Sequence, residues 1–287
     1  MIFFTKFTSW LPLPINRLLG KFIGMLLFYF KSTPYKIAHR NLELCFPELE
    51  EHQRNKLCYR SLVETGKMLI ENGIIFLAKN KKPLRYIRSV QGLEHLEAAI
   101  KKDQGVILAV PHIGSWELLI LYCSNLYATT VLYRPFKSNA FDQLVFEARS
   151  RYGAKLVPTD TTGVRELFKT MKRKELAIIL PDHEPKYGEG IFTAFFNQPA
   201  YTSTLTSKLA DKTKATVLIA YMERLAGSTG YRLHFKTIDN FEQQSIDEKT
   251  AAINLSIEKV IQSLPEQYLW IYRRFRTQPD NQINLYK

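Results

Sequence analysis

The stretch Gly105-Val-Ile-Leu-Ala-Val-Pro-His-Ile-Gly-Ser-Trp-Glu117 decides the fold of this chain. Its first six residues are apolar and rich in β-branched side chains, which is typical of a strand buried on both faces of a sheet. Pro111 ends the strand, and a helix is predicted from about Ser115. In open α/β sheets, ligands bind at the carboxyl ends of the strands. His112 is therefore predicted to lie at the edge of a ligand-binding cleft.

Strands and helices alternate after this stretch. Further strands are predicted at 129–133, 155–157, 176–180, 216–224 and 231–238, and further helices near 138–151, 163–173, 202–212 and 247–263. This alternation predicts an α/β fold with a central, mostly parallel sheet flanked by helices. Residues 190–196 are expected to form a flexible loop that leads into an apolar wall, which is either ordinary core or the lining of a channel for a fatty chain.

The N-terminal third has a different pattern. Residues 1–32 are predicted to form a hydrophobic, membrane-anchoring helix, and 33–287 a second unit that is helical to about 85 and α/β after it. A basic linker is predicted around Pro83, formed by Lys79, Lys81, Lys82, Arg85 and Arg88. The apolar run at 22–30 has nine residues, fewer than the about 20 that a spanning helix needs. A helix lying in one leaflet is favoured, with a marginal single span and a helix buried against the protein's own core as alternatives.

The charge favours an anionic partner. Lysine and arginine number 40 against 27 acidic residues, which gives a formal net charge of +13. Nucleic acid, acidic lipid, a phosphorylated substrate or an acidic protein would all fit. Cys45, Cys58 and Cys123 form no C-x-x-C pair, which argues against a disulfide framework or a zinc ribbon and for a reducing compartment.

His112 and Glu117 are the candidate catalytic residues. Glu117 lies about one turn into the predicted helix, where its carboxylate could reach back to one imidazole nitrogen and make the other a general base. The same spacing also suits a helix cap and a first-turn glutamate favoured by the helix dipole. Ser115 is disfavoured as a nucleophile, because a nucleophile elbow needs glycines where Ile113 and Glu117 stand.

Other polar residues are expected near this edge. Arg134 and Asp182 each follow a predicted strand, and Arg273 and Arg274 stand among aromatic residues near the C-terminus. Arginines there could bind phosphate or carboxylate, or could be ordinary surface residues. The chain has no phosphate loop, dinucleotide fingerprint, zinc-ligand spacing or nucleic-acid-binding signature, so no cofactor, metal or nucleic-acid partner is expected.

Taken in order, these segments resemble one family, the late acyltransferases of lipid A biosynthesis in Gram-negative bacteria. The resemblance covers nearly the whole chain. It is carried by the N-terminal hydrophobic helix and by a series of short blocks: Arg40-Asn41-Leu42, Cys45-Phe46-Pro47, His112 to Glu117, Tyr133-Arg134-Pro135, Asp182, Gly190 to Phe196, and Gln267-Tyr268 to Phe275.

The resemblance implies an acyltransferase domain at 33–287. It implies transfer of an acyl chain from acyl carrier protein to an anionic glycolipid, a Kdo-bearing lipid A precursor, at the cytoplasmic face of the inner membrane. His112 would be the base, Glu117 its orienting partner, and Arg134 and Asp182 residues near the site. The chain departs from the family's pattern at His183, where a glutamine is common, and at Asn197, where a glycine is common.

Two alternative functions are also compatible with the sequence. The first is an acyltransferase for another glycolipid or an aminolipid, because sibling enzymes share the block from His112 to Glu117. The second is a non-catalytic basic protein that binds membrane or nucleic acid, with steep salt dependence.

Overall fold

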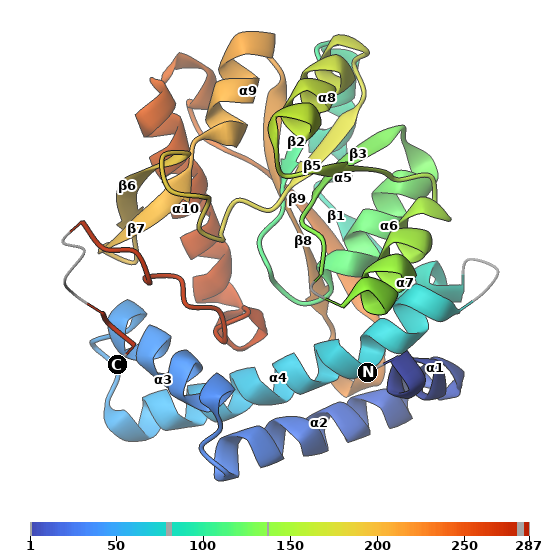
Figure 1. Ribbon diagram of the computed structural model, residues 1–287, viewed down its shortest axis with the longest axis vertical. Helices are drawn as coiled ribbons and strands as arrows, with labels where there is room; N and C mark the ends of the chain where they lie inside the picture. The colour runs from blue at the N-terminus through green and yellow to red at the C-terminus, as the bar shows by residue number, and fades with distance from the viewer. Residues whose placement is uncertain (1, 79–81, 137, 280–283, 287) are drawn as a thin grey trace.

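The computed structural model describes residues 2–78, 82–136, 138–279 and 284–286 (Figure 1). Its main sheet has seven strands in the order β1-β9-β8-β2-β5-β3-β4. These strands are β1 Ile87–Gln91, β2 Val106–Ala109, β3 Thr129–Tyr133, β4 Lys155–Pro158, β5 Leu176–Ile179, β8 Thr216–Arg224 and β9 Tyr231–Thr237. All neighbours are parallel except β8 and β9. The predicted α/β fold with a mostly parallel sheet is confirmed.

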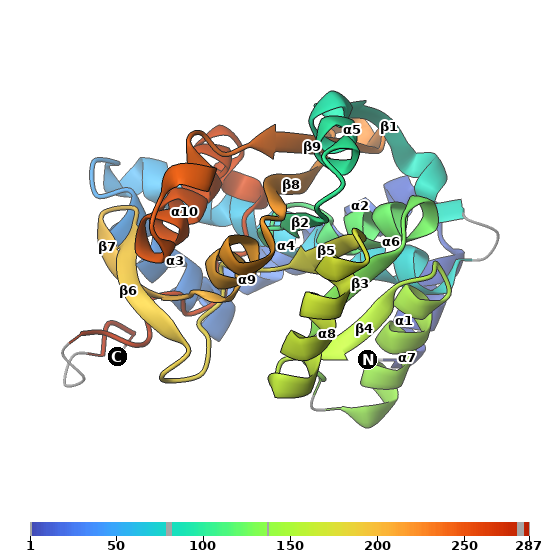
Figure 2. The same ribbon diagram turned by 90° about the horizontal axis from the view of Figure 1, so that it is seen from above.

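Helices cover both faces of this sheet, as Figure 2 shows from above. On β2, Val106 and Leu108 enter one hydrophobic core, and Ile107 and Ala109 enter the other, because alternate side chains point to opposite faces. The first core receives side chains from α5 Leu93–Lys101, α6 Trp116–Leu126 and α7 Asn139–Ser150, and the second from α8 Thr161–Lys172, α9 Leu205–Thr213 and α10 Ile246–Ser263. The N-terminal helices also supply residues to both cores.

A separate hairpin corrects one prediction. The flexible loop expected at 190–196 is wrong, because this segment is strand β6 Gly190–Phe195, paired antiparallel with β7 Gln198–Ser203. The turn between them consists of Phe196 and Asn197, both with positive φ (50° and 58°). Two left-handed residues in a two-residue turn match the twist of a hairpin. Strand β1 and helix α5 were not predicted from the sequence.

Four helices precede the sheet: α1 Ile2–Trp10, α2 Leu13–Tyr29, α3 Thr33–Cys45 and α4 Glu51–Leu77. The single helix expected at the N-terminus is broken between α1 and α2 by Leu11-Pro12. Of the predicted basic linker, Lys79 and Lys81 lie outside the described residues, and Lys82–Tyr86 forms a short 3-10 helix. In Figure 1, α2 lies along α4 on the side away from the sheet.

Helices α2 and α4 approach each other closely because glycines face each other at the crossing. A Cβ atom on Gly20 would lie 2.4 Å from the Cα of Lys67, and one on Gly66 would lie 2.1 Å from the carbonyl oxygen of Gly20. No side chain fits in that space. The crossing therefore requires glycine on both helices.

The opposite side of α2 is exposed and apolar. We call this the outer face of α2; it consists of Ile15, Leu18, Phe22, Leu26 and Tyr29, at helical spacing. Exposed Phe3, Phe7 and Trp10 of α1 precede it. Within the described residues, no single helix has the length and hydropathy to cross a bilayer, while α2 and α3 together meet that test with a bend of 78°.

Candidate active site

His112 lies in the loop after β2, where the chain makes a tight and well-anchored turn. Gly114 has a φ of +60°, and a Cβ there would lie 1.9 Å from the carbonyl oxygen of Met222 on β8. The amide of Gly114 donates to the carbonyl oxygen of Gln267, and that of Ser115 to Met222, both at 3.0 Å. The amide of Leu269 donates to the carbonyl oxygen of His112 at 3.0 Å. The loop is thus fixed to β8 and to the C-terminal segment.

The carboxylate that orients His112 is Asp182, which follows the neighbouring strand β5. Asp182 Oδ1 lies 2.8 Å from Nδ1 of the imidazole, and Oδ2 accepts the backbone N–H of His112 at 2.9 Å. The Asp182 side chain is fully buried, whereas 12% of the His112 side chain is exposed. Burial alone would raise the pKa of the Asp182 carboxyl, but the adjacent His112 holds that pKa well below its usual range. Asp182 is therefore a carboxylate fixed against one edge of the ring.

Glu117 does not make the contact with His112 that the sequence analysis expected. Its carboxylate accepts two hydrogen bonds from the guanidinium of Arg149, at 2.9 and 2.7 Å, and one from the indole of Trp116 at 3.2 Å. Arg149 comes from α7, so the start of α6 directs Glu117 toward that helix. The Trp116 ring meets the imidazole of His112 edge-on, with centroids 4.9 Å apart. Glu117 thus reaches His112 only through Trp116.

The arginines expected to bind substrate lie in three different environments. Arg134 follows β3 at the same sheet edge as His112 and is exposed. Arg273 is also exposed, with its guanidinium over the ring of Tyr286. Arg274 is buried and donates to the carbonyl oxygen of Tyr201 and the hydroxyl of Thr202, so it braces strand β7.

Three further residues belong to the site. Arg149, which pairs with Glu117, lies in the last turn of a predicted helix, and nothing in its spacing distinguishes it. The ring of His183 stacks on that of His112, and the ring of Tyr272 stacks on His183. Both residues stand in stretches that are polar or aromatic in sequence, but no role was predicted for either of them.

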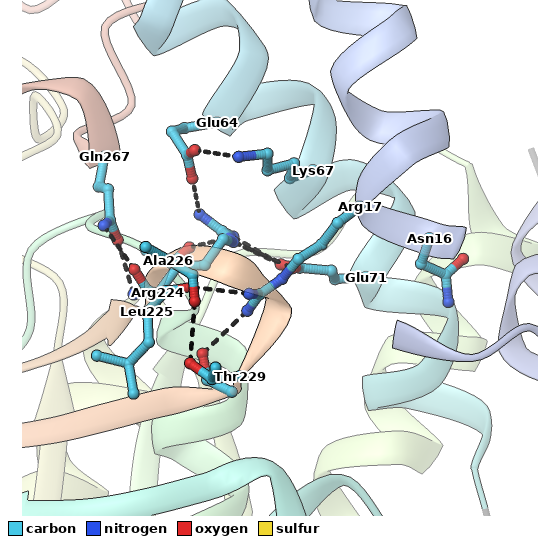
Figure 3. A network of polar contacts seen from close by, with 12 residues as sticks. Asn16, Arg17, Glu64, Lys67, Glu71, Arg224, Leu225, Ala226, Thr229 and Gln267 are labelled. Atoms are coloured by element: carbon cyan, nitrogen blue, oxygen red, sulfur yellow. Dashed lines mark hydrogen bonds and ion pairs between the residues drawn. The ribbon is translucent and has the colours of Figure 1, made fainter. Parts of the chain in front are cut away.

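A buried ionic network supports the His112 loop from the side of the N-terminal helices (Figure 3). Glu71 of α4 accepts from Arg17 of α2 at 2.7 Å and from Arg224 of β8 at 2.8 Å. Arg17 also donates to the carbonyl oxygens of Leu225 and Gly230. Helix α2 is thereby joined to the end of β8.

The same network continues to the loop itself. The guanidinium of Arg224 donates to Glu64 at 2.8 Å and to the carbonyl oxygen of Gly114 at 3.4 Å. The backbone of Arg224 exchanges two hydrogen bonds with the side chain of Gln267, at 2.7 and 2.9 Å. Since the Gln267 carbonyl also accepts from Gly114, the network holds the loop at two points.

No cluster of three or more His, Cys, Asp or Glu side chains suited to a metal ion occurs among the residues that the structure describes. The site contains a histidine fixed by a buried carboxylate, at the carboxyl edge of a sheet and with part of its ring exposed. Such a histidine can accept a proton from a bound hydroxyl.

This chain is similar to known proteins over almost its whole length. The family model of the bacterial lipid A biosynthesis acyltransferases matches residues 1–277. The chain is 30% identical to the lipid A biosynthesis lauroyltransferase of Escherichia coli K12, over 94% of this chain and 88% of that protein. It is 30% identical to the palmitoleoyltransferase of that strain, over 96% and 90% of the two chains, and 26% identical to its myristoyltransferase, over 96% and 84%. This chain belongs to the bacterial lipid A biosynthesis acyltransferase family and is an enzyme that transfers acyl groups.

Proposed function

We propose that the protein transfers a fatty acyl chain from acyl carrier protein to a hydroxyl of a lipid A precursor, with His112 as general base and no covalent intermediate. The family requires an acyl donor and a lipid A precursor as acceptor. The observation that carries the mechanism is the pairing of His112 with the buried Asp182 at the carboxyl edge of the sheet. Because Nδ1 contacts the carboxylate, Nε2 is the nitrogen available to the acceptor hydroxyl.

The chemical steps follow from this arrangement. His112 Nε2 takes the proton of the acceptor hydroxyl while the hydroxyl oxygen attacks the thioester carbonyl of the donor. The tetrahedral intermediate then collapses, the carbon–sulfur bond breaks, and the imidazolium returns the proton to the leaving thiolate. Asp182 stabilises the imidazolium between these two steps. A nucleophilic side chain is unnecessary, since the thioester is already activated.

Glu117 is proposed as a positioning residue in this mechanism. It accepts a hydrogen bond from the indole of Trp116, and the Trp116 ring contacts the His112 ring in a T-shaped arrangement. Its charge is balanced by Arg149, which also lies over the ring of Tyr133 at 5.2 Å. Loss of Glu117 would leave the buried guanidinium of Arg149 without its partner, which is costly in a low-dielectric environment.

Two features support a membrane-bound, anionic substrate. The outer face of α2 and the exposed aromatic residues of α1 form an apolar surface suited to one leaflet of a bilayer. The net charge of +13 favours the anionic cytoplasmic surface, the phosphorylated acceptor and an acidic carrier. Arg134, exposed beside the site, is proposed to bind an anionic group of a substrate, and so is the exposed Arg273 of the C-terminal segment.

The test measures acyl transfer by purified protein in detergent, with acyl carrier protein loaded with a fatty acid and a Kdo-bearing precursor, read by mass spectrometry. His112→Ala is expected to remove turnover while the circular dichroism spectrum is unchanged. His52→Ala, an exposed histidine on α4, is the matched control and should retain full activity. Turnover by His112→Ala at the control's rate would overturn the general-base assignment.

Two further measurements separate the remaining parts of the proposal. The intact mass of the protein after mixing with donor alone should show no added acyl group; a stable adduct would replace direct attack with a covalent route. Lipid A from cells lacking the gene should lose one acyl chain. Unchanged lipid A would assign the acceptor to a different lipid.

A further inference from the structure

Three aromatic rings from separate parts of the chain form one continuous stack at the site. The centroids of His112 and His183 lie 3.8 Å apart with 5° between the ring planes, and those of His183 and Tyr272 lie 3.7 Å apart with 14° between the planes. His112 follows β2, His183 follows β5 directly after Asp182, and Tyr272 lies in the C-terminal segment. We propose that His183 is a positioning residue, whose ring fixes the plane of the His112 imidazole for the transfer reaction. This inference rests on the proposed role of His112 as base.

One hydrogen bond does not fix the orientation of an imidazole. The contact of Asp182 with Nδ1 holds one edge of the His112 ring, but the ring can still tilt about that edge and move Nε2. A flat ring at van der Waals distance on one face prevents that tilt, and the Trp116 ring, 4.9 Å away between centroids, is a second aromatic neighbour of the imidazole. A displacement of about 1 Å at a reacting atom can cost about 100-fold in rate. The face contact therefore bears directly on the rate of proton transfer.

The far side of the stack is itself anchored. The hydroxyl of Tyr272 accepts the backbone N–H of Glu184 at 2.9 Å, and the buried carboxylate of Glu184 accepts from the amide and hydroxyl of Thr277 at 2.9 and 3.0 Å. Tyr272 is thus fixed to the loop that carries His183. Each ring of the stack is held by a polar contact, by a stacked neighbour, or by both.

The environment keeps His183 uncharged. Burial lowers the pKa of His183 well below its usual value, and the charges of His112, Arg274 and Arg134 lower it further, while Asp182 opposes them. A neutral ring presents its π face to the imidazolium that forms on His112. A charged ring would place a second positive charge 3.8 Å from it, centroid to centroid. His183 can therefore support His112 only as a neutral aromatic ring.

The experiment compares His183→Gln with His183→Phe in the detergent assay, by steady-state kinetics with both substrates. Glutamine keeps polarity and approximate length without a ring, whereas phenylalanine keeps the ring without a titrating group. His183→Gln is expected to lower kcat by about 10-fold with KM changed by less than about twofold, because misorientation affects the chemical step rather than binding. His183→Phe is expected to restore kcat to within about threefold of the unmodified protein.

Several outcomes would overturn the inference. Full kcat in His183→Gln would do so, and so would an equal loss in His183→Gln and His183→Phe, since the ring would then not be the decisive feature. If His183→Gln fails to fold, Tyr272→Leu tests the same stack from its other side and should lower kcat in the same selective way; unchanged kcat there refutes the stack's role. His112→Ala, measured in parallel, separates the two proposals: an inactive His112→Ala with a fully active His183→Gln leaves the base assigned and the positioning role rejected.

Discussion

Glu71→Gln tests the ionic network that joins α2 to the His112 loop. The substitution keeps the size of the side chain and removes one negative charge. Only 1% of the Glu71 side chain is exposed, and its two partners, Arg17 and Arg224, are exposed by 5% and 3%. Both guanidinium groups would then face a neutral amide at a position where their own side chains are almost fully buried.

The magnitude follows from this burial. Breaking a buried ion pair by removing one partner costs about 3–5 kcal/mol, because the remaining charge is left uncompensated. Arg224 keeps Glu64, so the lower end of that range, about 3 kcal/mol, is expected. Since a protein of this size shifts its melting temperature by about 2 °C per kcal/mol, the melting temperature should fall by about 6 °C.

The assay is chemical denaturation in detergent, followed by tryptophan fluorescence, with a thermal melt alongside. Glu242→Gln is the matched control, because it makes the same change in the exposed Glu242–Lys102 ion pair and should cost less than about 1 kcal/mol. A loss of under 1 kcal/mol for Glu71→Gln, equal to that of the control, would refute the reasoning.

Other predictions concern the site, the helix crossing and the outer face of α2. Asp182→Asn should lower kcat by about 10²- to 10⁴-fold with little change in KM, in the acyl-transfer assay, because it removes the charge that stabilises the imidazolium. Gly20→Leu should lower the free energy of unfolding, measured in denaturant, by at least the about 1–3 kcal/mol that overpacking usually costs, since α4 leaves no room for a side chain. Leu18→Asp should reduce binding to anionic vesicles in sedimentation, with kcat in detergent unchanged. The free energy of unfolding should fall by up to about 1.4 kcal/mol per pH unit as the pH drops below about 6.5. In that range His183 becomes protonated in the unfolded chain but stays neutral in the folded one, because folding lowers its pKa. His183→Gln should remove that contribution in denaturation at several pH values.

The results that count against these predictions are equally specific. Asp182→Asn with normal kcat would assign the orientation of His112 to other contacts. Gly20→Leu with normal stability would mean that α2 can move away from α4. Vesicle binding by Leu18→Asp at the unmodified level would exclude the outer face from membrane contact. Parallel pH curves for His183→Gln and the unmodified protein would exclude His183 as the titrating group.

The buried strands could be predicted from sequence because their composition leaves few alternatives. β2 and β5 are continuous apolar runs buried on both faces, and β3 and β8 coincide with the predicted ranges. β1 was missed because it is an edge strand of five residues, Ile87–Gln91, with mixed polarity and partial exposure. The β6–β7 hairpin was missed because its turn is Phe-Asn, whereas turns of this kind are usually marked by Asn-Gly or Asp-Gly.

The site was predictable in its position but not in its pairings. His112, Arg134 and Asp182 all follow strands, and parallel strands bring those residues to one edge. The carboxylate that contacts the imidazole is decided by the directions in which the side chains point, and these cannot be read from the sequence. Glu117 was predicted because it lies only five residues from His112. In the fold, β2 and β5 are neighbouring strands, so Asp182, which follows β5, contacts His112, which follows β2, although 70 positions separate the two residues. The stack of His183 and Tyr272 also joins distant segments and had no local signal.

Helix α2 has consequences for any shortened form of the enzyme. Arg17, on its inner side, donates to Glu71, and its glycines pack directly on the backbone of α4. The inner side of α2 is therefore part of the protein's interior, although its outer face is exposed. Deleting the first 32 residues to gain solubility would uncover the bare backbone of α4 around Gly66. It would also leave Glu71 with one cation fewer, beside the strand that holds the His112 loop. Detergent around the intact chain is therefore the better route to a working soluble preparation than truncation.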